Sequence, residues 1–435
     1  MTAALPYTAE RRLPWVEPLQ VAAGLGGGDG VLALLSDGGP GGRWSHLGAA
    51  PDVIQVEAVA EEGLFDALRD ARFGPGTAGL AAYDAGARPA TGRREAVWPD
   101  LMLARYPALL TFDHHQQTVR AIGRGASPEQ ADAALDRALG WRAAARSPQA
   151  PPAPSEDFRP EAPEQAYREA VADVVRRIGQ GELFQANVAR AWSGALKPGA
   201  DPFDVFLRLQ QGRASPFGAY WRLGERALVS NSPELFLAFD AASRRLEARP
   251  IKGTRPRAED AAQDAALADD LLASAKDRAE NLMIVDLMRN DLARVAIPGS
   301  VRVETLFAVE RHPTVHHLVS TVVAQAALGA GAADILQATF PPGSITGAPK
   351  HQAMKVIAAH EPPRGAWCGS LFLIEADGGL TASVLIRTAA FERDGDGSWR
   401  FRTLAGAGIV ADSDPGAELA ETEAKIAALR QALAG

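Results

Sequence analysis

The sequence has a single cysteine, Cys368, among its 435 residues. An internal disulfide needs two cysteines, so the chain suits a reducing compartment. There is no run of about 18 apolar residues that could span a bilayer, and the first residues, MTAALPYTAERRLPW, lack the apolar core of a signal peptide. We therefore expect a cytoplasmic protein that does not enter a membrane.

Positive charge is also scarce. The chain has 45 Lys and Arg residues against 53 Asp and Glu residues, which gives a formal net charge of −8 at pH 7. Proteins that coat nucleic acid usually present a basic surface, so we expect no nucleic-acid partner. An anionic small ligand would need a local cluster of cations. Hydrophobic residues (47%) and charged residues (23%) are in the range of ordinary globular proteins.

The sequence lacks internal repeats and regular βαβ alternation, and such a mixture of strands and helices favours the α+β class. Residues 1–145 are mostly strand-like segments and turns, with a helix expected at 128–145. Residues 146–160 are Pro-rich and form either a linker between domains or a loop within one unit. Residues 161–432 contain helical spacing at 167–178, 277–292 and 417–433, and strand-like runs such as 183–191.

The segment Arg249–Arg257 (RPIKGTRPR) carries four cationic side chains within nine residues. In an arbitrary chain such a segment is most often a solvated basic turn. Lys252, however, lies between Ile251 and Gly253, where it can be buried. A desolvated lysine has a lowered pKa and can act as an amine nucleophile.

Two pairs of carboxylates have helical spacing. Asp277 and Glu280 are three residues apart, as are Glu418 and Glu421, so each pair shares one face of a helix. Mg²⁺ prefers oxygen ligands and takes one or two carboxylates from a protein, so two facing helices would suit it. Such pairs are usually solvated, and at this point both interpretations remain open.

Two glycine-bounded segments, 343–350 and 405–408, predict turns whose backbone N–H groups can approach an anion. Neither segment matches a nucleotide-binding motif. The adjacent His316 and His317 are either core or catalytic residues, and their spacing alone favours the core.

A series of short motifs follows in order between about residue 160 and residue 430. They are GELFQAN at 181–187, SPE at 232–234, PIKGT at 250–254, ENLMIVD at 280–286, RND at 289–291, HLVS at 317–320, GAPK at 347–350, IRT at 386–388, GAG at 406–408 and ETEAK at 421–425. In this order they closely resemble the chorismate-utilising enzymes, which include anthranilate, aminodeoxychorismate, isochorismate and salicylate synthases. The resemblance is weaker across the N-terminal part of the chain.

This resemblance implies a two-lobed α/β sandwich, with mixed and antiparallel sheets, helices outside and the active site between the lobes. It assigns the N-terminal part of the fold to residues 1–145 and the chorismate-binding catalytic domain to residues 161–432. It also implies Mg²⁺, which would neutralise the ring carboxylate of chorismate. The implied metal residues are Glu280 and Glu421, with Asp277 and Glu418 near the waters of the ion.

The same resemblance assigns roles to further side chains. Glu234 would protonate the leaving hydroxyl, and His317 would lie close to the reacting ring. Arg387 and the backbone of Gly406, Ala407 and Gly408 would hold the second carboxylate of the substrate. The remaining implied substrate contacts are Gln185, Gly253, Thr254, Trp367 and Lys425.

Two positions distinguish subgroups of the family. Isochorismate and salicylate synthases carry a lysine base where this chain has Gln185, which cannot activate water. Anthranilate synthases typically have alanine where this chain has Lys252, and lysine there is typical of aminodeoxychorismate synthases. Asn187 and Trp367 are similar to that subgroup as well. Phe372-Leu373 and the segment 380–383 depart from its pattern, so the wall of the pocket is less well defined by the resemblance.

In that subgroup the lysine amine adds to C2 of the ring as the C4 hydroxyl leaves, and ammonia then attacks C4. The expected product is 4-amino-4-deoxychorismate, on the route to p-aminobenzoate and folate. Because Cys368 is not in a nucleophile motif, the chain should not hydrolyse glutamine by a cysteine triad. The resemblance therefore points to ammonia supplied by a separate glutamine amidotransferase subunit in a heterodimer. We also expect elimination to p-aminobenzoate to belong to another protein.

Two alternative functions remain at the level of the sequence. Within the family, the alternative is the chorismate-binding component of anthranilate synthase. From another class, the chain could be a non-catalytic scaffold that only binds an amidotransferase. A scaffold, however, would have no use for the combination of Glu234, Lys252, Glu280, His317 and Glu421.

Overall fold

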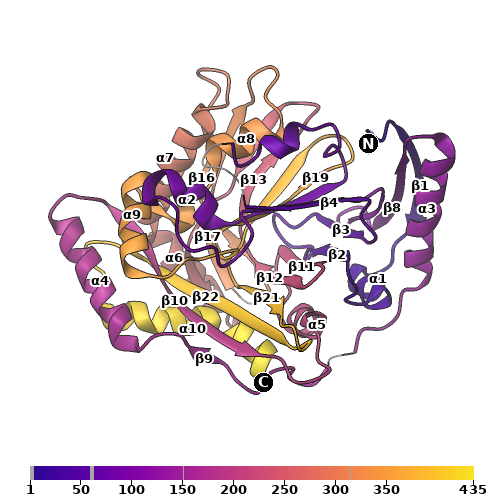
Figure 1. Cartoon of the computed structure of the whole chain (residues 1–435). Helices are drawn as coiled ribbons and strands as arrows, with labels where there is room; N and C mark the ends of the chain where they lie inside the picture. Colours follow the sequence, from indigo (N-terminus) through magenta and orange to yellow (C-terminus); the bar gives the residue numbers. More distant parts are fainter. Residues whose placement is uncertain (1–3, 59–62, 150, 314) are drawn as a thin grey trace.

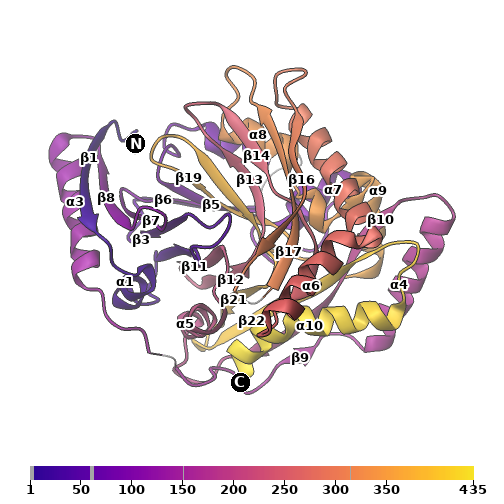
Figure 2. The ribbon, with the colours of Figure 1, turned by 180° about the vertical axis from the view of Figure 1, so that it is seen from behind.

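The computed structural model describes residues 4–58, 63–149, 151–313 and 315–435. In this part of the chain the strands form two antiparallel sheets, one of 12 and one of 10 strands. The sheets face each other, and helices lie outside them (Figures 1 and 2). The protein is therefore an α+β sandwich, as the sequence predicted.

The large sheet runs through both halves of the chain. In spatial order its strands are β1 (Tyr7–Pro14), β8 (Thr118–Gly125), β7 (Ala108–Asp113), β3 (Trp44–Gly48), β2 (Leu32–Leu35), β11 (Phe217–Leu223), β12 (Arg226–Ser232), β21 (Thr388–Arg393), β22 (Trp399–Ile409), β10 (Gln185–Ala195) and β18 (Gly347–Ala348), with β9 (Arg159–Pro160) beside β10.

The small sheet is also built from both halves. Its order is β15 (Ile251–Pro256), β17 (Val315–Gln325), β14 (Arg245–Ala248), β13 (Leu235–Phe239), β20 (Leu380–Val384), β19 (Ser370–Ile374), β5 (Thr77–Ala81), β6 (Leu101–Arg105) and β4 (Val53–Glu57), with β16 (Arg302–Arg311) beside β17. The N-terminal strands β2 and β5 pair directly with β11 and β19, so strands from both sides of the Pro-rich segment share each sheet. The division into regions 1–145 and 161–432 stays a prediction, and residue 150 lies outside the described residues.

Alternate residues of the central strands face different cores. On β11, Trp221 and Leu223 pack between the sheets, whereas Tyr220 points to the outer face under the helices. This is the period of two expected for a strand, with both faces apolar because both are covered. The outer face of the large sheet is covered by α1 (Pro18–Leu25), α3 (Pro128–Ala143), α5 (Pro202–Arg213) and α10 (Pro415–Ala434).

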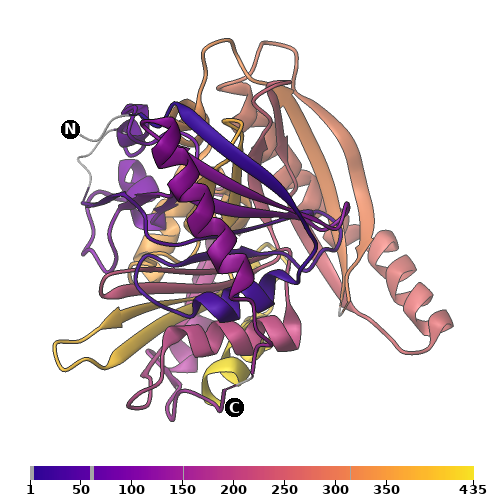
Figure 3. The same ribbon diagram turned by 90° about the vertical axis from the view of Figure 1, so that its right-hand side faces the viewer.

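The other helices pack against the small sheet or the end of the large one (Figure 3). They are α2 (Tyr83–Thr91), α4 (Glu164–Gly179), α6 (Ala261–Ala273), α7 (Ala275–Ala293), α8 (Ala332–Thr339) and α9 (Lys350–His360), with short 3₁₀ turns at Asp66–Arg69 and Gly343–Ile345. Residues of α4 and α9 form a separate apolar cluster with β10 and β22. In the described residues no helix is both long and apolar enough to cross a bilayer.

The structure corrects two expectations. Segment 405–408 is not a turn but lies inside β22, where Gly406 pairs with Ala189 of β10. Its glycines are needed because the neighbouring strand β10 comes close. A Cβ on Gly406 would lie 2.8 Å from the carbonyl oxygen of Val188 on that strand. The N-terminal region also contains the helices α1 and α2, which were expected to be strands and turns.

The chain passes between the sheets at two neighbouring points. Residues 233–234 connect β12 of the large sheet to β13 of the small one, and residues 385–387 connect β20 back to β21. The two connections are bonded, since Val384 N–H donates to the carbonyl oxygen of Glu234 at 3.1 Å. Glu234 and Arg387 therefore belong to two crossings that are bonded to each other at the junction of the sheets.

Candidate active site

Glu234 is a buried acid at the first of these crossings, with 5% of its surface exposed. Burial raises the pKa of its carboxyl group, while hydrogen bonds from Ser344 and from the backbone of Ile251 and the charges of Lys252 and Lys425 act in the opposite direction. A raised pKa favours the protonated form of the carboxyl group. Such a group can donate a proton to a leaving oxygen.

Lys252 lies on β15, the edge strand of the small sheet, and its amine points toward β22 of the large sheet. A Cβ placed on Gly408 would lie 3.5 Å from the Lys252 Nζ. Burial lowers the pKa of this amine, against the charges of Glu280, Glu234 and Glu421. The amine therefore lies among carboxylates in surroundings whose desolvation favours its neutral form, the form that a nucleophilic lysine needs.

The structure separates the roles of the two adjacent histidines. His316 Nε2 lies 2.9 Å from Asp264 of α6, and the side chain is completely buried. His317 points the other way, with Nδ1 2.9 Å from the Thr254 hydroxyl on the neighbouring strand. Burial, together with the charge of Arg387, lowers the pKa of His317 to about 3. Only His317 therefore lies in the site, as a neutral imidazole.

The four predicted metal carboxylates come from two helices. Glu280 and Asp277 lie on α7, and Glu421 and Glu418 on α10. Burial raises the pKa of Glu280, and the negative charge of Glu421 acts in the same direction. The two groups are thus close enough to interact across the site.

Asp277 and Glu418 have protein partners already. Asp277 accepts a hydrogen bond from Arg255 at 3.1 Å, and Glu418 accepts one from the Ser413 hydroxyl at 2.7 Å. Glu421 forms an ion pair with Lys425 at 2.6 Å, but half of its side chain (49%) remains exposed. Glu280 and Glu421 are consequently the carboxylates best able to accept a further cation.

The donor set fits Mg²⁺. Within the described ranges no three or more His, Cys, Asp or Glu side chains gather into a closed metal cage. Mg²⁺ does not require one, because it usually keeps several waters and binds through one or two carboxylates together with its substrate. Two hard oxygen donors on facing helices meet that requirement.

Arg387 is a largely buried cation at the second crossing, in a left-handed backbone conformation with φ 51°. Burial lowers its pKa, the charge of Arg213 adds to this effect, and no carboxylate of the described residues counteracts it. A buried cation without an anionic partner is costly. Its surroundings therefore favour an anionic ligand.

Unpaired polar atoms line the wall formed by β10 and β22. Both amide atoms of Gln185 and the Oδ1 of Asn187 are buried without a hydrogen-bond partner in the described residues. A Cβ on Gly408 would come within 2.2 Å of the Gln185 Nε2, so only glycine leaves this space open. Buried polar groups are nearly always bonded, so these atoms favour a polar ligand.

The two remaining predicted substrate residues also border this space. Lys425 donates to the carbonyl oxygen of Gly406 at 2.9 Å and pairs with Glu421, so it is tied to both the glycine wall and the carboxylates. Trp367 is buried, and its Nε1 has no partner in the described chain. The sequence-predicted residues from β10, β15, β17, β22, α7 and α10 thus converge on one region.

Some contributing residues were not foreseen. Ser344 bonds to Glu234, and Lys276 lies 4.0 Å from Glu280. Ser344 belongs to the glycine-bounded segment 343–350, so its motif was visible but its partner was not. Lys276 had only its helical spacing to Glu280 as a signal. The buried Arg364 carried no signal at all in the sequence.

Comparisons with known proteins identify the family. Residues 45–431 match the family model for chorismate binding enzymes. The chain is 40% identical over 363 residues to aminodeoxychorismate synthase component 1 of Escherichia coli, a match that covers 82% of this chain and 76% of that protein. It is 36% identical over 372 residues to anthranilate synthase component 1 of Thermus thermophilus, covering 83% and 78%.

Solved structures show the same fold. Anthranilate synthase component I from Streptococcus pneumoniae superposes with a TM-score of 0.76 at 27% identity, covering 89% of this chain and 92% of that one. MenF, the menaquinone-specific isochorismate synthase from Escherichia coli, gives a TM-score of 0.75 at 19% identity, covering 100% and 96%. The chain therefore belongs to the family of chorismate-binding enzymes.

Proposed function

We propose that this chain is the chorismate-aminating component of an aminodeoxychorismate synthase, working in the cytoplasm on the route to p-aminobenzoate and folate. It would convert chorismate and ammonia to 4-amino-4-deoxychorismate and water. The observation that carries the proposal is the position of the Lys252 amine, which lies beside Gly408 and among the charges of Glu234, Glu280 and Glu421, where burial lowers its pKa. The 40% identity to relatives named aminodeoxychorismate synthase component 1 supports the same assignment.

In the proposed reaction the Lys252 amine attacks C2 of the ring. The ring double bonds shift, the C4–O bond breaks, and Glu234 gives its proton to the departing hydroxyl, which leaves as water. Ammonia then attacks C4, the double bonds shift back, and the C2–N bond breaks. The proton that Lys252 loses on addition passes to the Glu234 carboxylate and returns to the lysine nitrogen when the C2–N bond breaks. The proton that the new C4 ammonium loses then restores the Glu234 acid, so both groups are regenerated.

The surrounding residues would bind and orient the substrate. Arg387 and the backbone of Gly406–Gly408 would hold one carboxylate, and Gln185, Asn187 and Trp367 would contact the ring and its substituents. His317, neutral and bonded to Thr254, can donate or accept a hydrogen bond without adding charge. Glu280 and Glu421 would hold Mg²⁺, with Asp277 and Glu418 near its waters; the ion would neutralise the ring carboxylate of chorismate.

The ammonia would come from a glutamine amidotransferase subunit bound as a heterodimer. Cys368 supports this division of labour, because its thiol is completely buried and burial raises its pKa. A reactive cysteine needs the opposite environment, one that is accessible and lowers the thiol pKa.

The test is a product analysis with purified protein, chorismate, Mg²⁺ and an ammonium salt at alkaline pH. We expect 4-amino-4-deoxychorismate and little or no anthranilate. Anthranilate as the main product would instead favour the anthranilate synthase alternative, and no turnover would favour a scaffold.

Variants of Lys252 separate a nucleophile from a simple cation. Lys252→Ala should lose most activity and can release anthranilate, because ammonia can then reach C2. Lys252→Arg keeps the charge but cannot act as a neutral amine, so it should be nearly as inactive. A covalent adduct trapped during turnover should map to the peptide that contains Lys252. If Lys252→Arg kept most of the wild-type rate, the lysine would be only a charge.

A further inference from the structure

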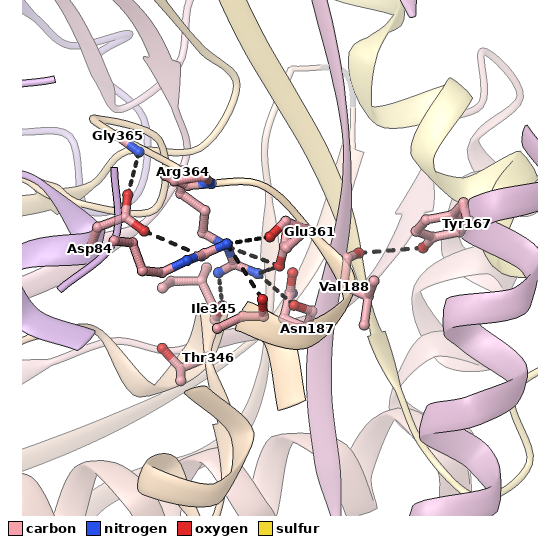
Figure 4. Close-up of polar contacts among 12 residues, drawn as sticks. Asp84, Tyr167, Asn187, Val188, Ile345, Thr346, Glu361, Arg364 and Gly365 are labelled. Carbon is pink, nitrogen blue, oxygen red and sulfur yellow. Dashed lines mark hydrogen bonds and ion pairs between the residues drawn. The ribbon is translucent and has the colours of Figure 1, made fainter. Parts of the chain in front are cut away.

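Arg364 is a buried cation in the connection between α9 and β19, with 2% of its surface exposed. Its Nη2 lies 2.5 Å from the Oε1 of Glu361, a carboxylate whose side chain is 1% exposed. The faces of the guanidinium lie near two aromatic rings, with its carbon 4.5 Å from the ring centre of Tyr83 and 5.0 Å from that of Trp367. Figure 4 shows the guanidinium at the centre of this polar cluster.

The same guanidinium bonds to the backbone of two separate segments of the site. Nη1 donates to the carbonyl oxygen of Ile345 at 3.1 Å, and Nη2 donates to that of Asn187 at 2.6 Å (Figure 4). Ile345 follows Ser344, whose side chain bonds to Glu234. Asn187 lies on β10 two residues after Gln185, with its side-chain oxygen 2.6 Å from the place that a Cβ on Gly406 would take.

A second layer of contacts fixes Arg364 itself. Gly365 N–H donates to Asp84 of α2 at 2.7 Å, and Arg94 donates to the carbonyl oxygen of Glu361 at 2.5 Å. Tyr83, whose ring lies 4.5 Å from the guanidinium carbon, belongs to the same helix as Asp84. The guanidinium is therefore fixed from α2 and from α9, and cannot move independently of either.

We propose that Arg364 is a positioning residue for the amination of chorismate, which joins β10, the Ser344–Thr346 segment and Trp367 into one rigid wall. It acts through those groups and not on the substrate itself. This inference rests on the proposed function, because it assumes that Glu234, Gln185 and Trp367 face the reacting ring. It assigns a role to a residue that no sequence motif of the site contains.

The chemistry of the side chain explains why arginine is needed. A buried ion pair is costly to desolvate and is often no more stable than a well-packed apolar pair. The planar guanidinium, however, carries five donors and can bond to a carboxylate and two carbonyls while stacking on aromatic rings. A lysine ammonium in the same place could keep the charge but could not reach all these partners at once.

The test compares two variants with the wild type. One is the single variant Arg364→Lys, and the other is a double variant that carries both Arg364→Gln and Glu361→Gln. The double variant removes both charges, so it avoids leaving Glu361 buried and unpaired. Arg105→Lys is the matched control, because Arg105 is equally buried (2%) and pairs with Asp52 on the other side of the small sheet. All are assayed with chorismate, Mg²⁺ and ammonium. Calorimetric titration with chorismate counts the competent sites, which are the active sites that still bind this substrate.

We expect kcat per competent site to fall about 100-fold in both Arg364 variants, because a displacement of about 1 Å at the chemistry has that effect. KM for chorismate should change within about threefold, since the carboxylate grips are not moved. The hydrogen bond from Ser344 lowers the pKa of Glu234. Its loss should therefore move the alkaline limb of the kcat profile to higher pH, a change that reduced stability alone would not produce.

Arg105→Lys should keep the wild-type kcat and pH profile even if its unfolding temperature falls. If the Arg364 variants also kept wild-type kcat per competent site and an unshifted profile, Arg364 would be only structural and the proposal would be wrong. The identity of the wild-type product tests the proposed function separately. A wild type that made anthranilate would overturn that function, while the ratio of variant to wild-type kcat would still decide the role of Arg364.

Discussion

His317 gives the sharpest physical prediction, because its environment should keep it neutral at every pH at which the protein is folded. The side chain is 3% exposed, and burial is the main reason that its pKa falls to about 3, from an ordinary value of 6.5. Nearby cations act in the same direction, first Arg387 and then His312. His312 lies 5.2 Å away ring to ring and has its own pKa raised to about 9 by Asp37 and Glu310, despite its burial.

The size of the effect follows from proton linkage. In the unfolded chain His317 binds a proton below about pH 6.5, whereas in the folded protein it does so only near pH 3, so folding loses stability as the pH falls through that window. Each unit of pKa difference corresponds to about 1.4 kcal/mol. The loss attributable to His317 is about 2 kcal/mol at pH 5 and approaches about 5 kcal/mol below pH 3.

The assay compares urea denaturation of the wild type and His317→Gln at pH 8 and pH 5. Glutamine can still bond to Thr254 but does not titrate, so the variant should lose about 2 kcal/mol less stability than the wild type between the two pH values. The other titrating groups are common to both proteins and cancel in the difference. His351→Gln, at an exposed position on α9, is the control and should behave like the wild type. An identical loss in wild type and His317→Gln would refute the neutral buried imidazole.

Three further predictions concern the site. Glu280→Gln or Glu421→Gln should abolish ammonia-dependent turnover, while circular dichroism shows an intact fold. The wild type should also lose turnover in excess chelator. Near-normal rates in any of these cases would contradict the magnesium assignment. Gly408→Ala places a Cβ 2.2 Å from Gln185 Nε2 and should lower kcat/KM about 100-fold. The control is Gly395→Ala, in the hairpin between β21 and β22. It should have no effect, because no atom lies within 4 Å of a Cβ at that position. Cys368→Ser should leave ammonia-dependent kinetics unchanged, and the isolated wild type should form essentially no product with glutamine alone; stoichiometric use of glutamine would refute the two-subunit model.

The parts of the fold that the sequence predicted best were those with long, regular patterns. The helices α4, α7 and α10 were expected within a few residues of their observed ends, because their apolar spacing extends over several turns. The helices α1 and α2 were missed. Each is only two turns long, too short for its periodicity to be distinguished from the surrounding strand and turn residues.

Glycine was a misleading signal at 405–408. In a sequence, closely spaced glycines usually mark a turn, but here they lie inside a strand because β10 and its side chains leave no room for a Cβ. The lack of room for a Cβ is a feature of the tertiary structure. It depends on Gln185 and Asn187, which are more than 200 residues away and could not be placed beside β22 from local spacing.

The site residues also divide into those that the local sequence could predict and those that it could not. Lys252 could be singled out because its apolar neighbour and glycine made burial in an otherwise cationic segment reasonable, and the structure leaves it only partly exposed, with burial lowering the pKa of its amine. Arg364 could not, since its pairing with Glu361 three residues earlier, in EPPRGAWCG, has no local feature that distinguishes a buried ion pair from an exposed one. Its partners Asn187 and Ile345 belong to distant segments, and a contact of this kind becomes visible only when the fold is known.

The balance of charge at the junction of the sheets explains why an acidic protein can bind a dicarboxylate. Arg387 is a largely buried cation that forms no ion pair within the described residues, and both amide atoms of Gln185 and the Oδ1 of Asn187 are buried without hydrogen bonds. Each of these groups costs stability in the free protein, because it gave up water without gaining a partner. A dianionic ligand with ring oxygens can pair with all of them, so part of its binding energy comes from relieving this cost.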